Sequence, residues 1–269
     1  MKLKLLLLLF IPLSFSFTSS KVITVLRPDF ESAFKEYNVE GSFLAYDLQA
    51  KTRYVYNPKR CKERFSPAST FKIFNSLVAI ETGVAPDANY ELKWDSIDRH
   101  NANWNRNTDM KAAFANSTVW YYQQLAKSIG PARMKEWIEK VGYGNNDISG
   151  GIDEFWLTGN LRISQEEQVE FLRKLYLGEL PFSKRTMDMV KEIMVNEQTD
   201  SYKLSGKTGW AIRDEFNIIW FVGFLERNDK VYLYATNFET VYEDLPTITK
   251  GRIEITKSIF RKMNVIPKN

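Results

Sequence analysis

The chain has 269 residues, with 37 Lys and Arg, 33 Asp and Glu, and a formal net charge of +4. It contains one cysteine, Cys61, and one histidine, His100. These counts exclude an intramolecular disulfide and the zinc sites built from several cysteines or histidines, and they leave one histidine for any Ser-His-Asp relay. If a nucleophilic side chain acts here, its base is expected to be a residue other than histidine.

The first twenty residues have the pattern of a secretory signal peptide. A start with two lysines precedes the apolar run LLLLLFIPLSFSF, and small polar residues follow it up to Ser20. The run is shorter than the ~20 apolar residues that span a bilayer, and Pro12 interrupts it. The pattern predicts cleavage near Ser20, no stable membrane anchor, and a periplasmic or secreted product. Loss of Lys2 and Lys4 lowers the formal charge from +4 to +2, too balanced to indicate a nucleic-acid partner.

Residues 21–269 are expected to form one domain. Helical spacing of apolar residues predicts a helix at 29–38, and the runs GSFLAYDL and TRYVYN predict a β-hairpin. Ser69 opens an apolar helical run, and later helix starts are predicted at Asp109, Pro131 and the capping-box sequence from Ser164 to Glu167. After residue 200 the pattern changes to three strands and a final helix, at 202–210, 217–226, 230–239 and about 249–263.

Strands at both ends with helices between them predict an α/β (α+β) fold. We expect an antiparallel sheet built from N- and C-terminal strands, flanked by helices and carrying an inserted helical subdomain. The sheet-containing part would comprise about residues 21–75 and 196–269, and the helical part about residues 76–195.

The sharpest local motif is Ser69-Thr-Phe-Lys72. A serine at a helix start and a lysine three residues later lie on one helical face, so the amine could take the serine proton if its pKa falls well below the ordinary ~10.4. The same spacing in Ser32-Ala-Phe-Lys35 is interpreted as a solvated helix face.

Two later motifs strengthen the first. Lys207-Thr208-Gly209 lies in a predicted strand, where it offers a charge, a hydroxyl and a backbone that a substrate can approach. Ser117-Thr118-Val119 lies within a predicted helical segment. Each could be structural by itself, as a strand end or as a surface serine.

Together and in this order, the three motifs resemble the class D, or oxacillinase-type, β-lactamases of the penicillin-recognising serine-enzyme superfamily. That family carries S-T-F-K, S-x-V and K-T-G, as this chain does. Tyr143-Gly-Asn145, the stretch Phe155-Trp-Leu-Thr-Gly159 and Arg252 extend the match, whereas the S-D-N element of class A is missing. The resemblance covers the chain from about residue 40 onward and implies a β-lactamase/transpeptidase-like domain.

The resemblance implies an exported serine hydrolase that opens the β-lactam ring of penicillin-type antibiotics. Ser69 would form the acyl-enzyme, and Lys72, carboxylated by carbon dioxide to a carbamate, would be the base for acylation and deacylation. Ser117 would pass a proton to the leaving nitrogen. Val119 and Trp156 would support the carbamate, and the substrate would be bound by Lys207, Thr208, Gly209, Trp210 and Arg252. The backbone N–H groups of Ser69 and Trp210 would form the oxyanion hole.

No metal and no cofactor other than this carbon dioxide are expected, and the protein could be a monomer or a homodimer. Taken alone, Trp156 could be a core aromatic and Arg252 a solvated helix charge. His100 is interpreted as a loop residue and Cys61 as an inert thiol. Two other functions use the same serine and lysine: a β-lactam sensor or penicillin-binding protein that stays acylated, and a peptidoglycan peptidase.

Overall fold

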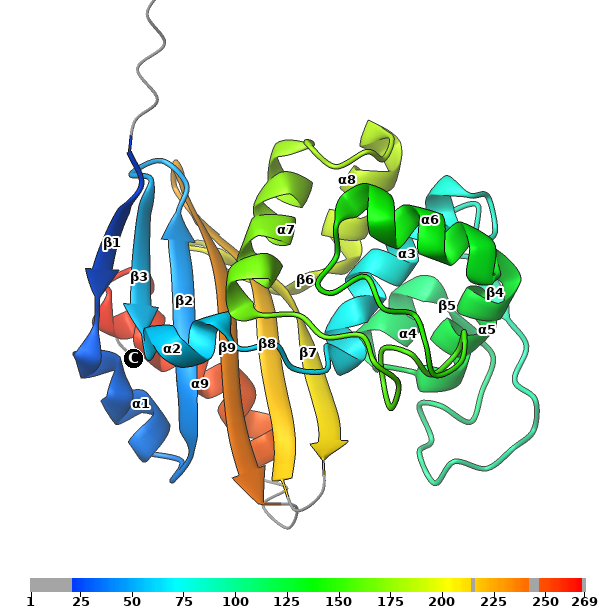
Figure 1. The fold of residues 1–269 in the computed structure, drawn as a ribbon, viewed down its shortest axis with the longest axis horizontal. Helices are drawn as coiled ribbons and strands as arrows, with labels where there is room; N and C mark the ends of the chain where they lie inside the picture. Colours follow the sequence, from blue (N-terminus) through cyan, green and yellow to red (C-terminus); the bar gives the residue numbers. More distant parts are fainter. Residues whose placement is uncertain (1–20, 214–215, 242–246, 268–269) are drawn as a thin grey trace, which may run out of the picture.

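The computed structural model describes residues 21–213, 216–241 and 247–267, so the predicted signal peptide lies outside the described residues. A sheet of seven strands occupies one side of the molecule and most of the helices the other (Figure 1). In spatial order the strands are β1 (Ile23–Leu26), β3 (Thr52–Tyr56), β2 (Glu40–Asp47), β9 (Lys230–Val241), β8 (Phe216–Arg227), β7 (Lys203–Arg213) and β6 (Val195–Gln198). Strands from both ends of the chain therefore meet at the β2–β9 pair, as the sequence predicted.

The strand pairs are antiparallel with one exception, because β1 runs parallel to β3. The predicted antiparallel sheet is confirmed, and the parallel strand β1 is an addition at its edge that the sequence did not indicate. All four residues of β1 are exposed, so β1 lacks the alternation of buried and exposed side chains that marks a half-buried strand.

Helices cover both faces of the sheet. One face packs against a short turn (Pro28–Phe30) with α1 (Glu31–Lys35) and against α9 (Arg252–Lys262). The other face carries α2 (Pro58–Lys62) and α7 (Gln165–Leu177), which lie in front of the strands in Figure 1. The final helix starts later than predicted, because a π-helical turn at Thr247–Gly251 precedes α9.

The rest of the helices lie beyond β7. They are α3 (Lys72–Glu81), α4 (Met110–Ala115), α5 (Val119–Ile129), α6 (Pro131–Val141) and α8 (Lys184–Ile193), with a small two-stranded sheet of β4 (Glu91–Leu92) and β5 (Thr108–Asp109). The predicted helix starts are confirmed: Asp109 accepts the Ala112 N–H at 2.7 Å, Pro131 is the first residue of α6, and Ser164 with Glu167 forms a capping box at α7. No helix in the described residues is long and apolar enough to cross a bilayer.

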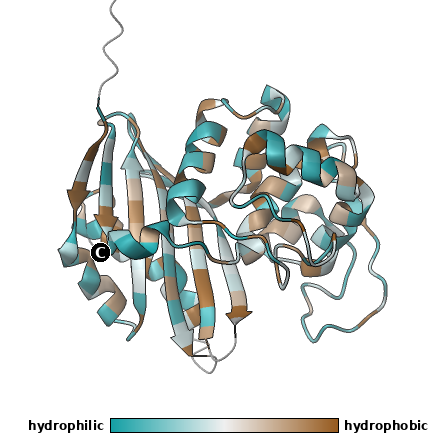
Figure 2. Cartoon of the chain, viewed as in Figure 1, coloured by the Kyte–Doolittle hydropathy of each residue, from teal (hydrophilic) through white to brown (hydrophobic). Residues whose placement is uncertain are grey.

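The central strands are buried on both faces, which explains their continuous apolar runs. In β8, Ile219 and Phe221 belong to the cluster under α1 and α9, whereas Trp220 and Val222 belong to the cluster shared with the helical part. In Figure 2, brown segments lie along several strands, and teal residues are frequent on the helices. At ~1.5–3 kcal/mol for each large apolar side chain, this burial is the main stabilising contribution.

Two glycines let β7 and β8 approach closely. Gly206 of β7 pairs with Gly223 of β8. A Cβ atom on Gly223 would lie 1.9 Å from the Ser205 carbonyl oxygen, which is backbone and cannot rotate away.

We therefore expect Gly223→Ala to force the two strands apart and to lower the unfolding free energy by about 3 kcal/mol. Chemical denaturation measures the loss. Gly83→Ala is the control, because Gly83 has a φ of +73° but open space around it, so that only about 1 kcal/mol of backbone strain is expected. Equal losses in the two variants would contradict this account of the β7–β8 contact.

Candidate active site

The first serine–lysine motif lies in a tight turn rather than in the first turn of an α-helix. Ala68–Phe71 forms a 3-10 turn, and α3 begins at Lys72. Ala68 has a φ of +45° and donates its N–H to the Trp156 carbonyl at 3.0 Å. A non-glycine residue in this region stores on the order of 1 kcal/mol of strain, so its surroundings must hold the turn in place. The turn aims the Lys72 amine at Ser69, and Nζ donates to Oγ at 2.9 Å.

Lys72 is almost completely buried. Its side chain is 1% exposed, and its amine lies 5.2 Å from the centre of the Tyr122 ring. Burial lowers the pKa of Lys72 to about 7, because the charged form loses its hydration. A substantial fraction of the amine is therefore neutral at physiological pH, when it can accept a proton or react with an electrophile.

Aromatic side chains pack around Phe71, the last residue of the turn that carries Ser69. Phe71 stacks on Trp156 with ring centres 5.2 Å apart, and it also packs against Phe74 and Phe155. Tyr143 lies against Phe71 as well, at 5.6 Å. The Tyr143-Gly-Asn145 element thus supports the turn through the contact of Tyr143 with Phe71. The Asn145 side chain fixes this element in turn by accepting the Arg162 backbone N–H at 2.9 Å.

Trp156 has a polar group without a partner. The residue is fully buried, and its indole Nε1 makes no hydrogen bond to any described residue. A buried donor of this kind costs ~1–3 kcal/mol unless an acceptor reaches it. An acceptor brought by a modification or a ligand would satisfy it.

Ser117-Thr118-Val119 does not lie inside a helix, and here the prediction was wrong. α4 ends at Ala115 and α5 begins at Val119, so Ser117 and Thr118 form the break between them. The backbone N–H groups of Ser117 and Thr118 donate to the carbonyl oxygens of Phe114 and Ala113, respectively. Ser117 has a φ of +56°. An apolar pattern that continues through both helices conceals this break.

The break presents Ser117 to the lysine of the third motif. Lys207 Nζ donates to Ser117 Oγ at 2.6 Å, and it also contacts the carbonyl and the hydroxyl oxygen of Thr208 at 3.3 Å each. Lys207 is 4% exposed. Burial and the positive charges of Lys72 and Arg252 hold the pKa of Lys207 well below its ordinary value. The second serine–lysine pair is thus electrostatically coupled to the first.

Gly209 brings β7 against the turn that carries Ser69. A Cβ atom at this position would lie 3.0 Å from the Pro67 carbonyl oxygen and 3.0 Å from the Thr70 side chain. A larger residue would press on both, so that the strand or the turn would have to shift by a few tenths of an ångström.

The same strand offers a free backbone edge beside Ser69. The Gly206 N–H points away from β8 and donates to the Met194 carbonyl at 2.8 Å. N–H groups alternate in direction along a strand, and the β7–β8 register is unbroken from Lys203 to Arg213. The Trp210 N–H therefore also points away from β8, at a position that β6 does not reach, since β6 pairs with β7 only as far as Ser205. The Trp210 indole is engaged elsewhere and donates to Asn217 at 2.6 Å.

Arg252 begins α9, on the other side of the sheet. It is mostly buried, burial lowers the pKa of its guanidinium, and its Nε has no hydrogen-bond partner among the described residues. Its positive charge helps to lower the pKa of Lys207. No hydrogen bond joins Arg252 to Thr208 in the described part of the chain. Arg252 is therefore not a solvated helix charge.

The remaining candidates take no part in this arrangement. His100 lies in an exposed loop with its side chain 93% accessible, near Asp98. Cys61 is buried, and burial raises the pKa of its thiol to about 12, so that it stays protonated. Ser32 and Lys35, which share the spacing of the first motif, are both exposed, and Lys35 pairs with Glu31.

Sequence reasoning missed Tyr122, whose ring lies under the Lys72 amine. Its hydroxyl pairs with Ser76 at 2.9 Å. The helical spacing of Val119 and Tyr122, three residues apart, could have placed Tyr122 on the same helix face as Val119, the residue expected to support the carbamate.

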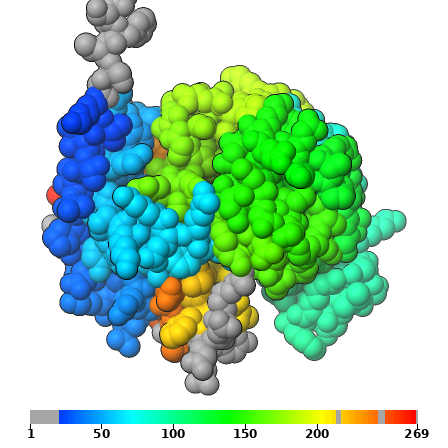
Figure 3. Space-filling view, in the orientation of Figure 1, coloured from blue at the N-terminus to red at the C-terminus, as the bar shows by residue number. Residues whose placement is uncertain are grey.

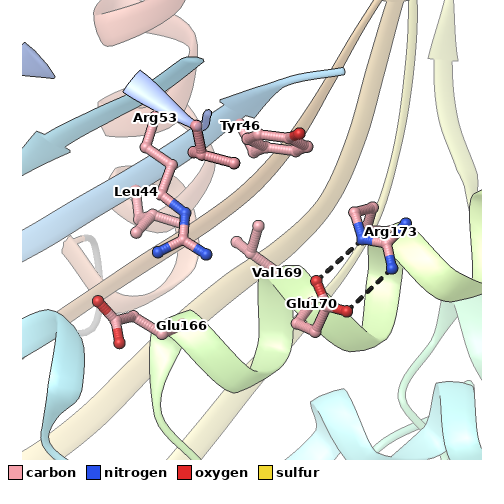
Figure 4. A pocket seen from close by; sticks show the side chains of 8 residues that line it. Leu44, Tyr46, Arg53, Glu166, Val169, Glu170 and Arg173 are labelled. Carbon is pink, nitrogen blue, oxygen red and sulfur yellow. Dashed lines mark hydrogen bonds and ion pairs between the residues drawn. The ribbon is translucent and has the colours of Figure 1, made fainter. Parts of the chain in front are cut away.

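A separate hollow lies between the sheet and α7 and contains none of these residues. It is lined by Val22, Leu44, Tyr46, Arg53, Glu166, Val169, Glu170 and Arg173 (Figure 4). Arg173 is bound to Glu170 at 2.9 Å, and the Arg53 guanidinium lies beside Leu44 in this view. The serine–lysine pairs lie instead between β7 and the helical part. Figure 3 shows a notch at the lower edge of the molecule, between the end of the sheet and the segment around residues 93–107.

Comparison with known proteins places this site in a family. Residues 27–264 match the model of the penicillin binding protein transpeptidase domain. The chain is 40% identical over 246 residues to the probable β-lactamase YbxI of Bacillus subtilis, covering 91% of this chain and 88% of that protein. It is also 40% identical over 237 residues to the β-lactamase OXA-48 of Klebsiella pneumoniae, covering 87% of each.

A solved structure gives the same result. The class D β-lactamase YbXI from Nostoc superposes with a TM-score of 0.85 at 46% identity, covering 88% of this chain and 99% of that one. The chain belongs to the penicillin-binding transpeptidase-domain family, and within that family to the class D β-lactamases.

The buried amine predicts a specific pH dependence of stability. In the unfolded chain Lys72 titrates near pH 10.4, and in the folded protein near pH 7. Between these values the unfolded state binds more protons, so the unfolding free energy rises with pH. Lys72→Met should reduce this slope by up to ~1.4 kcal/mol per pH unit, measured by chemical denaturation between pH 7 and 10 in buffers free of carbon dioxide.

Lys35→Met is the matched control, because Lys35 has the same motif spacing but is exposed. It should leave the slope unchanged. A Lys72→Met slope equal to that of the native chain would show that Lys72 keeps an ordinary pKa in the folded protein.

Proposed function

We propose that this chain is an exported enzyme that hydrolyses β-lactams through an acyl-enzyme on Ser69. The observation that carries the proposal is the 2.9 Å contact between Ser69 Oγ and the buried Lys72 amine, whose pKa is about 7. A serine hydroxyl becomes a nucleophile when an adjacent base takes its proton, and Lys72 is the base within reach. The names of the relatives, which are β-lactamases, give the substrate class.

In the first step Ser69 Oγ attacks the lactam carbonyl carbon while the Lys72 side chain takes its proton. Negative charge then develops on the carbonyl oxygen. The Ser69 N–H and the Trp210 N–H on the free edge of β7 are the expected donors to that oxygen, and fixed donors of this kind contribute ~3–4 kcal/mol each to the transition state.

In the second step the lactam C–N bond breaks and the nitrogen must receive a proton. Ser117 can donate it, and Lys207 at 2.6 Å can resupply Ser117. The proton that Lys72 took from Ser69 then restores the one that Lys207 gave up, so that the Lys72 side chain can act as a base again. Water attacks the acyl carbon and gives a proton to the Lys72 side chain. That proton passes to Ser69 Oγ as the acyl C–O bond breaks.

The Lys72 site fits a carbamate. Carboxylation needs a neutral amine, which burial provides, and the unpartnered Trp156 indole N–H is a donor for an added oxygen. Val119, the half-buried first residue of α5, is the expected apolar support. A carbamate would supply an anionic oxygen base for both proton transfers.

The substrate carboxylate is expected to bind at the cationic end of β7. Thr208 offers a hydroxyl, Lys207 adds positive potential, and Arg252 has a buried Nε without a partner in the described residues. Arginine suits a carboxylate because its donors form a planar fork. Gly209 leaves space for the substrate to lie along the strand.

Export supports this substrate, since β-lactams meet their targets outside the cytoplasm. The lysine-led apolar run of residues 1–20 is the basis for proposing a signal peptide. The site would then act in the periplasm or the surrounding medium.

A turnover assay tests the function. Residues 21–269 mixed with a chromogenic cephalosporin or a penicillin, with bicarbonate present, should complete many turnovers. A single stoichiometric burst would contradict hydrolysis and favour a sensor that stays acylated.

Ser69→Ala should abolish acylation, and Lys72→Ala should lose turnover by at least ~10³-fold, since a general base contributes ~10²–10⁴-fold in each of two steps. Lys35→Ala should turn over normally.

The carbamate is tested separately and without relying on activity. The protein in ¹³C-bicarbonate should give a carbamate carbon signal by NMR, which is absent in Lys72→Ala and weakened in Trp156→Phe, because that variant keeps the ring but loses the indole donor. Degassing should lower turnover, and bicarbonate should restore it. Equal signals from the native chain and Lys72→Ala would place the modification elsewhere.

A further inference from the structure

The turn that presents Ser117 is held in an unfavourable backbone conformation. Ser117 has a φ of +56° although it is not glycine, and it lies where α4 has ended and α5 has not begun. Its hydroxyl lies 2.6 Å from the Lys207 amine, and it must stay within hydrogen-bond distance for the two to exchange a proton. Contacts outside the turn are needed to keep it there, because a residue of this kind relaxes when it is free to do so.

Two tryptophans, Trp104 in the preceding loop and Trp120 in α5, form a clamp that links that loop to this turn. The Trp104 indole N–H donates to the carbonyl oxygen of Asn116 at 3.0 Å, in the peptide group directly before Ser117. In return, the Trp120 indole N–H donates to the Trp104 carbonyl at 2.8 Å. Trp120 belongs to the first turn of α5, so the loop is tied to both sides of the break.

Trp104 is itself fixed in the loop. Its backbone N–H donates to the Asn101 carbonyl at 2.8 Å, and its half-buried ring packs against the core of the helical part. The clamp therefore joins an anchored side chain to the peptide group whose rotation would release Ser117.

We infer that Trp104 is a positioning residue that holds Ser117 against Lys207 through the Asn116 carbonyl. This inference rests on the proposed function for its effect on the reaction. Loss of the indole donor lets the Asn116–Ser117 peptide rotate, so that Ser117 spends less time within reach of Lys207. Proton delivery to the leaving nitrogen slows, and acylation slows with it, whereas release of the acyl group from Ser69 does not require Ser117.

The same loop contains a matched control. The Trp94 indole N–H donates to the Ile97 carbonyl at 3.0 Å, and Trp94 also packs half-buried against the same core. Trp94→Phe therefore removes an indole-to-carbonyl bond from the same loop without touching the turn at Ser117.

The first measurement does not depend on activity. In Trp104→Phe, hydrogen exchange at the Thr118 amide, which donates to Ala113 at 2.9 Å, should accelerate at least tenfold relative to the native chain. Trp94→Phe should leave this exchange rate unchanged. Unchanged exchange in Trp104→Phe, or equal acceleration in both variants, would overturn the inference even if the protein proves not to hydrolyse β-lactams.

The second measurement is a double-mutant cycle on the acylation rate constant, followed in a single turnover with a chromogenic cephalosporin. Trp104→Phe should lower acylation about tenfold in the native background and have no further effect in Ser117→Ala, while deacylation changes less than twofold. An equal loss in both backgrounds, a rise in KM alone, or a matching loss in Trp94→Phe would contradict the role. If the native chain does not acylate, the proposed function fails. The exchange experiment still tests whether Trp104 holds the turn at Ser117.

Discussion

The arrangement at this site depends on the burial of one amine. Lys72 begins α3 and is almost completely buried, with the Tyr122 ring and the Ser69 hydroxyl beside its amine, and burial alone lowers its pKa to about 7. A lysine in water would be protonated at physiological pH and could not act as a base. Phe71, in the turn directly before Lys72, stacks on Trp156 and so helps to hold that turn in place. Chemistry that other hydrolases assign to histidine can proceed here without one.

β7 organises what surrounds this amine. It contributes Lys207 to the second serine–lysine pair, a glycine that permits close contact with the Ser69 turn, and a free backbone edge at Trp210. Three functions come from one strand because side chains and N–H groups alternate along it in fixed directions. The strand in turn depends on its pairing with β8, where opposed glycines allow the close approach. Substrate access, electrostatics and strand packing are therefore coupled.

Most of the fold could be predicted from the sequence, because the long strands and capped helices have strong local signals. The hairpin of β2 and β3, the three C-terminal strands and the capping box at Ser164 follow from periodicity and capping chemistry. Predictions failed where local pattern and tertiary structure disagree. β1 has no alternation, and the break at Ser117 is set by backbone bonds to Ala113 and Phe114 and by the clamp from Trp104. The lysine pKa values also depend on burial, which no sequence motif encodes.

Lys72 is substantially neutral at physiological pH because it is buried. An NMR titration of the lysine side-chain signals, with Lys72 assigned from the Lys72→Met spectrum and carbon dioxide excluded, measures this directly. The Lys72 signal should titrate with a midpoint near pH 7. A midpoint near pH 10.4, the value of a solvated lysine, would contradict it.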